Sequence, residues 1–129
     1  MRLVQFSFLT LMLASIVHAD DGRTLYLRYC ASCHGYDARG NGRVAAALVN
    51  PPSDLTQIAR RRGGTYPTSE IAAFIDGRRE IRAHGGSDMP VWGTLLRQEF
   101  DDKADPEQTT VGVVDSIAEY LRTIQEYKK

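Results

Sequence analysis

Two cysteines three positions apart, with a histidine directly after the second, are the residues of this sequence best placed to do chemistry. Cys30 and Cys33 enclose Ala31 and Ser32, and His34 follows. At this spacing two thiols can add across the two vinyl groups of a haem to form thioethers, while the adjacent imidazole ligates the iron from one side. The segment therefore predicts a covalent haem c site, with one haem per chain.

Two other chemistries use closely spaced cysteines. A structural zinc site needs four Cys or His ligands, usually as two spaced pairs, and this chain has only two cysteines. A thioredoxin-like dithiol or a plain disulfide needs no third cysteine and stays open, but it leaves His34 without a role. Haem attachment is the interpretation that uses all three residues.

A second iron ligand is expected further along the chain. Met89 is the one methionine outside the leader described below. It lies in the glycine- and proline-rich stretch 85–93, which we expect to be free of helix, and Pro90 stiffens the chain directly after it. A methionine that only fills the core would more often lie on an apolar helix face. We therefore expect Met89 and His34 to ligate the iron from opposite sides.

His84 is the alternative to Met89 as the second ligand. A His/His pair would lower the reduction potential relative to a His/Met pair, because thioether sulfur favours ferrous iron. The other interpretation of His84 is an exposed or hydrogen-bonded loop residue. With both axial positions filled, the iron has no vacancy for a substrate, so the site predicts one-electron exchange and no catalysis by the chain itself. A gas-binding or sensing haem protein needs a labile or absent sixth ligand and stays open as another function.

The first 19 residues have the pattern of a secretory signal peptide. A short basic start precedes a mostly apolar run from Leu3 to Val17, and Ala19 is a small residue suited to cleavage. The run is short for a membrane span, which needs about 20 apolar residues, although an uncleaved signal anchor stays open. We expect a protein exported to the periplasm or otherwise out of the cytoplasm, with residues 20–129 forming one domain.

The charge balance argues against a nucleic-acid partner. The sequence has 16 basic and 16 acidic residues, whereas nucleic-acid-binding domains carry an excess of clustered basic charge. The charges are nevertheless segregated, with arginines in the middle of the chain (residues 60–62, 78, 79 and 82) and acidic residues between 99 and 119. Two solvated faces and electrostatic steering of a redox partner are the two interpretations of this segregation.

Helices must position these residues, because no segment shows the sustained alternation of a strand. We expect an all-α fold with four to five helices around one haem. The clearest helix contains Val113–Ile124, where apolar residues recur at i, i+3, i+4 and i+7. A first helix should run from Gly22 to Cys30 behind two capping aspartates. Shorter helices are expected at 43–48, at 54–62 and from residue 68 or 69 to a stop at Gly77, with a loop at 35–42.

Taken together, these features resemble a class I, monohaem bacterial cytochrome c. The resemblance rests on the cysteine–histidine motif, on the Met89–Gly93 stretch, on residues 37–42 and 51–56, and on the closing helix with Ile117, Tyr120 and Leu121. It covers nearly all of residues 20–127. It implies that the first and last helices cross, with Gly22 and Tyr26 of the first meeting those three residues of the last.

The resemblance also implies roles for residues around the haem. In such proteins a proline carbonyl commonly accepts a hydrogen bond from the second nitrogen of the axial histidine, and Pro52 is the expected residue here, with Pro51 next. Trp92 would pack at the haem edge or bond a propionate, or else simply fill the core. The acidic segment Glu99–Thr109 is similar to an insertion that varies within the family, and the sequence assigns it no role.

The function that the resemblance implies is the transfer of single electrons between redox protein partners. One form is an exported carrier in a respiratory or dehydrogenase-linked chain. The alternative is a dedicated haem subunit of a periplasmic oxidoreductase complex.

Overall fold

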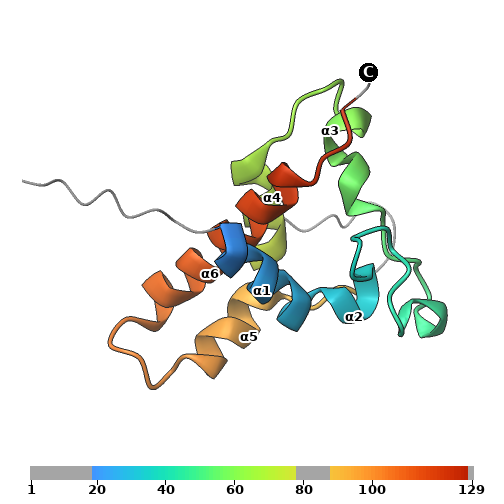
Figure 1. Cartoon of the computed structure of the whole chain (residues 1–129). Coiled ribbons are helices and arrows are strands. Elements are labelled where there is room, and N and C mark those ends of the chain that lie inside the picture. The colour runs from blue at the N-terminus through green and yellow to red at the C-terminus, as the bar shows by residue number, and fades with distance from the viewer. Residues whose placement is uncertain (1–18, 78–87, 128–129) are drawn as a thin grey trace, which may run out of the picture.

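The computed structural model describes residues 19–77 and 88–127, and in these residues it contains helices and no strand. Figure 1 shows the arrangement, which confirms the predicted all-α class. The expected leader therefore lies outside the described residues except for Ala19, and His84 also lies outside them. The elements are α1 (Ala19–Tyr29), α2 (Ala31–His34), the 3₁₀ turns η1 (Ala45–Ala47) and η2 (Leu55–Gln57), α3 (Ile58–Arg61), α4 (Thr68–Asp76), α5 (Trp92–Glu99) and α6 (Pro106–Thr123).

The first and last long helices, α1 and α6, cross in close contact, as the family resemblance implied (Figure 1). Gly22 makes the contact possible, because a Cβ atom at this position would overlap the carbonyl oxygen of Ser116 and lie 2.9 Å from Cβ of Tyr120. One turn later, the rings of Tyr26 and Tyr120 lie with their centroids 5.4 Å apart. Buried Ile117 and Leu121 complete the α6 face of this core.

The chain after α2 folds back onto α2 through main-chain contacts. The Gly42 amide donates to the Cys33 carbonyl at 3.0 Å, and a Cβ atom on Gly42 would overlap the backbone of Ser32 and Cys33. The phenol of Tyr26 reaches the same region and donates to the Gly35 carbonyl at 2.7 Å. Residues 35–42 form the predicted loop, and the short turn expected after it is η1.

The helix expected at residues 54–62 is divided into η2 and α3. Asp54 caps the first part by accepting a hydrogen bond from the Thr56 amide at 2.9 Å. Gln125, beyond the end of α6, bonds both parts, since its side chain accepts from the Ala59 amide and donates to the Leu55 carbonyl, each at 2.8 Å. The end of α4 follows the prediction, because Gly77 adopts a left-handed φ of 85° there.

Helix α5 is the main error of the sequence-based prediction, which expected Trp92 and Gly93 to lie in a helix-free stretch. Its single fully buried large side chain, Leu96, packs into the core, and the helix contacts both α4 and α6. Too few apolar residues recur in its eight positions for a periodic pattern to be visible. The prediction of four to five helices omitted α5 and assigned no helix to the residues of α2.

The acidic segment Glu99–Thr109 has a structural role that the sequence did not assign. Glu99 accepts hydrogen bonds from Arg28 at 2.5 Å and from Tyr29 at 3.0 Å, which fixes the end of α5 to α1. Asp105 caps α6 by accepting from the Gln108 amide at 2.9 Å, directly before a proline at the first helical position. The segment therefore turns the chain from α5 into α6.

Candidate functional site

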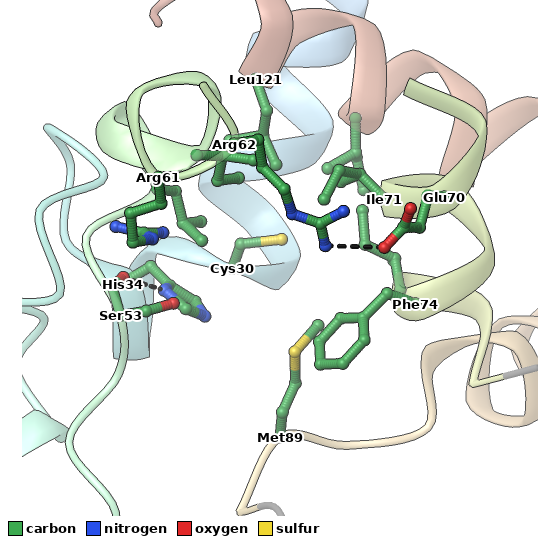
Figure 2. A pocket seen from close by; sticks show the side chains of 14 residues that line it. Cys30, His34, Ser53, Arg61, Arg62, Glu70, Ile71, Phe74, Met89 and Leu121 are labelled. Carbon is green, nitrogen blue, oxygen red and sulfur yellow. Dashed lines mark hydrogen bonds and ion pairs between the residues drawn. The ribbon is translucent and has the colours of Figure 1, made fainter. Parts of the chain in front are cut away.

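A cavity of about 430 Å³ lies between the helices, next to a second cavity of about 210 Å³. Both are bordered by Cys30, His34, Ser53, Phe74 and Met89. Figure 2 shows the larger cavity, which is lined by side chains from α2, η2, α3, α4 and α6, by Cys30 between α1 and α2, and by the segment before α5. The fold thus brings the predicted cysteine, histidine and methionine to one space, although they lie up to 59 positions apart in the sequence.

His34 ends α2 with its imidazole at the wall of the cavity (Figure 2). Its Nδ1 lies 3.1 Å from the carbonyl oxygen of Ser53. Burial lowers the pKa of His34 and outweighs the hydrogen bond to Ser53, which acts in the opposite direction, so the neutral ring is favoured. A neutral ring that donates from Nδ1 keeps an unprotonated Nε2, which is the form that binds a metal.

The prediction that His34 bonds the Pro52 carbonyl is wrong by one residue, because the acceptor is the carbonyl of Ser53. The Pro52 carbonyl faces Gly40 instead, where a Cβ atom would overlap it. Pro51 and Pro52 both border the smaller cavity, so they lie near the site without orienting the imidazole. The direction of a main-chain carbonyl depends on the local backbone, and Ser53 carries no sequence signal for this role.

The two thiols lie at the cavity walls and are not bonded to each other. Cys30 is 8% exposed, and burial, helped by nearby Cys33, raises the pKa of Cys30 to about 12. A redox dithiol needs a lowered thiol pKa, so this environment does not favour that alternative. The described part of the chain also brings no three His, Cys, Asp or Glu side chains together in a group that could hold a metal ion, as structural zinc would need.

Met89 enters from the segment between α4 and α5, and Figure 2 shows its thioether directed into the cavity from a different side than His34. The Phe74 ring of α4 lies beside the thioether in the same view. Trp92 borders the smaller cavity and packs edge-on against Tyr29, with ring centroids 5.5 Å apart. The role of Trp92 at the haem edge and its alternative role as a core residue both stay predictions.

A charged rim closes one side of the larger cavity. Arg62 pairs with Glu70 at 2.6 Å (Figure 2). Arg61 donates to the Asp54 carbonyl at 2.9 Å. The sequence showed these arginines as part of a basic run, but nothing in it indicated that two of them line the site. Their side chains are exposed to solvent and directed along the mouth of an otherwise apolar space.

One comparison with known proteins gives a match. A family model described as cytochrome C oxidase, cbb3-type, subunit III, matches residues 17–104, which is more than half of the chain. No curated protein and no solved structure matches the chain.

Proposed function

We infer the function from the premise that the chain belongs to this family, the cytochrome c domains described as cytochrome C oxidase, cbb3-type, subunit III. Domains of this family are monohaem c-type cytochromes, so membership implies covalently bound haem c with iron, electron transfer and redox partners. The residues around the cavity fit that group. Two thiols at the attachment spacing, an imidazole with its Nδ1 already engaged and a thioether border one largely apolar space.

We propose that Cys30 and Cys33 hold the haem through thioethers and that His34 and Met89 are the axial ligands of its iron. The observation that carries this assignment is the Nδ1 contact of His34 with the Ser53 carbonyl, because it selects the ring form whose Nε2 can bind a metal. The group, when bound, supplies one-electron exchange between ferric and ferrous states. Apolar residues of α3, α4 and α6 exclude water from the site.

The proposed role is that of an electron carrier that performs no catalysis by itself. We propose that residues 1–19 direct its export, that it acts in the periplasm in a respiratory or dehydrogenase-linked chain, and that its partners are redox proteins and not nucleic acids. None of the helices between residues 19 and 77 or between 88 and 127 has the length and apolar character needed to cross a membrane.

Absorption spectra of the purified protein test the site. Haem attached through thioethers remains with the chain after acid–acetone extraction, and haem that can be extracted would contradict the assignment. A ferric protein with sulfur on the iron has a near-infrared charge-transfer band. We expect this band to disappear in Met89→Ala and to persist in the matched variant His84→Ala. If only His84→Ala loses the low-spin spectrum, the second axial ligand is His84 and not Met89.

A second candidate function is that of a haem subunit in an oxidoreductase complex, which the description of the family as an oxidase subunit favours. Co-purification with a larger catalytic chain at high salt supports this candidate, because a transient carrier contact is small and salt-sensitive. Rapid binding of carbon monoxide to the reduced protein would instead support a gas-binding protein and would contradict Met89 as a firm ligand.

A further inference from the structure

The segment that carries Met89 connects α4 to α5, and the end of α4 lies against the start of α5. A Cβ atom on Gly77, directly after α4, would overlap the Val91 side chain directly before α5. A Cβ atom on Gly93, the second residue of α5, would overlap both Oδ1 and the main-chain oxygen of Asp76. The last residue of α4 and the first turn of α5 therefore touch, and Met89 lies only three residues before α5 begins.

The side chain at this junction is a buried carboxylate. The Asp76 side chain is 6% exposed, and its Oδ1 lies 3.5 Å from Nη1 of Arg97. Arg97 follows Gly93 by four residues, so both lie on one face of α5 and Asp76 contacts that face twice. The same nitrogen of Arg97 lies 3.2 Å from Glu107 of α6, which is exposed.

Helix α5 depends on this contact at its start. Val91, the residue before the helix, provides no side-chain hydrogen bond to the first amides. The Asp76 carboxylate lies beside Gly93, where its negative charge interacts favourably with the positive N-terminal end of the α5 dipole. It therefore fixes the position of the first turn of α5 relative to α4, and α4 itself lines the cavity through Phe74 and Ile75.

We propose that Asp76 is a positioning residue for Met89, holding the thioether at the iron by fixing the start of α5 to the end of α4. The inference rests on the proposed function, in which Met89 is the axial ligand. Without the carboxylate, the first turn of α5 can shift away from α4, and only two residues separate that turn from Met89. The bond between sulfur and iron then opens more often, and an external ligand reaches the iron sooner.

The test uses the complete ferric haem protein. In Asp76→Asn, which conserves side-chain size, we expect imidazole to bind the iron about tenfold faster, the effect of losing one hydrogen bond to a charged group. The near-infrared sulfur–iron band should weaken, and the reduction potential should fall because methionine ligation favours ferrous iron. Thermal unfolding is measured on the same samples, since a purely structural residue would lower only the melting temperature.

Two variants of the charged residues joined to Asp76 are compared with Asp76→Asn. Arg97→Gln removes one partner of Asp76 and should raise the imidazole rate about threefold, less than loss of the carboxylate itself. Glu107→Gln removes the exposed partner of Arg97 and should leave the band and the rate unchanged. If Asp76→Asn does not yield a folded haem protein, the Arg97→Gln result decides.

The outcomes separate this inference from the proposed function. A wild-type band that is lost in Met89→Ala supports the ligand assignment. With that result in hand, a normal band and a normal imidazole rate in Asp76→Asn, whatever its melting temperature, overturn the role of Asp76 alone. A wild-type protein without the band overturns the assignment of Met89 and the role of Asp76 together.

Discussion

The two sides of the cavity are constructed in different ways. The histidine side, comprising residues 30–44 and Ser53, is held by main-chain contacts between nearby residues, with Gly42 against Ser32 and Cys33. The methionine side, comprising residues 76, 77 and 88–97, consists of the end of α4, an irregular stretch and the start of α5, and side chains such as Asp76 and Arg97 join the two helices. Backbone atoms packed against a glycine have no rotamer with which to make room for an added side chain, whereas side-chain contacts can be lost one at a time.

This difference indicates how each side responds to substitution. On the histidine side a changed residue should disturb the fold itself, since the attachment segment and the loop that covers it share their backbone hydrogen bonds. On the methionine side a changed residue should leave the fold largely intact and alter how firmly Met89 is held.

The largest effect is expected for Gly42→Ala on the histidine side. The added methyl group would overlap the main-chain atoms of Ser32 and Cys33, which have no rotamer in which to avoid it. We expect a loss of about 2–3 kcal/mol in the free energy of unfolding, measured by denaturant titration. Gly112→Ala is the matched control, because apart from its chain neighbours and its own helix backbone no heavy atom lies within 4 Å of the added Cβ. As Gly112 lies in α6, the control should gain about 0.5–1 kcal/mol. Equal stability of the two variants would contradict the comparison.

A smaller effect is expected for Tyr26→Phe, which leaves the Gly35 carbonyl without its 2.7 Å donor. The buried carbonyl loses one neutral hydrogen bond, at a cost of about 1–2 kcal/mol in the free energy of unfolding. Tyr36→Phe is the control, since Tyr36 is exposed, and its stability should be unchanged. A Tyr26→Phe protein as stable as wild type would show that Gly35 is not fixed by this contact.

Stability at alkaline pH tests the burial of the same phenol. Burial, followed by the charges of Cys30, Tyr120 and Asp37, raises the pKa of Tyr26 above its ordinary value of 10.0. The folded protein keeps the proton at a pH where the unfolded chain releases it. The contribution is therefore complete below pH 10 and decreases as the pH rises above that value. Melting temperatures of Tyr26→Phe should decrease less steeply above pH 10 than those of wild type; parallel curves would contradict this role.

The smallest change in stability is expected on the methionine side, for Asp88→Ala. Asp88 accepts a hydrogen bond from the Asn50 amide at 2.9 Å, and this exposed contact ties the segment of Met89 to the loop beside the smaller cavity. The free energy of unfolding should fall by less than about 1 kcal/mol. Imidazole binding to the ferric iron should nevertheless become faster than in wild type. Asp102→Ala, which removes only a pair with the adjacent Lys103, is the control. A large loss of stability with an unchanged imidazole rate would reverse the comparison.

The same contrast explains what could be predicted from the sequence. Cys30, Cys33 and His34 lie within one short segment, so residue types alone indicated their chemistry. Met89 could be chosen because the chain offers few alternatives outside the leader, and the structure brings it to the same cavity as His34. The end of α4 at Gly77 followed from a local backbone preference.

The errors concern features that depend on tertiary contacts. Helix α5 is short and depends on Leu96 in the core and on Asp76, which lies 16 positions before Trp92. No local pattern encodes such support. The acceptor for His34 is a main-chain carbonyl, which every residue carries, so the sequence could not distinguish Ser53 from Pro52. The position of Arg61 and Arg62 at the mouth of the cavity depends on how η2 and α3 join, which is also a tertiary property.

The crossing of α1 and α6 has a consequence for moving this domain into another protein. The recognisable family segment ends at residue 104, yet α6 begins at Pro106 and supplies the surface that Gly22 and Tyr26 contact. Beyond α6, Gln125 bonds Ala59 and Leu55. A transplant that stopped at residue 104 would leave Tyr26 uncovered and the cavity without one wall. The segment that must be transferred for the domain to keep these contacts therefore extends to at least residue 125, about twenty residues past the part that matches the family model.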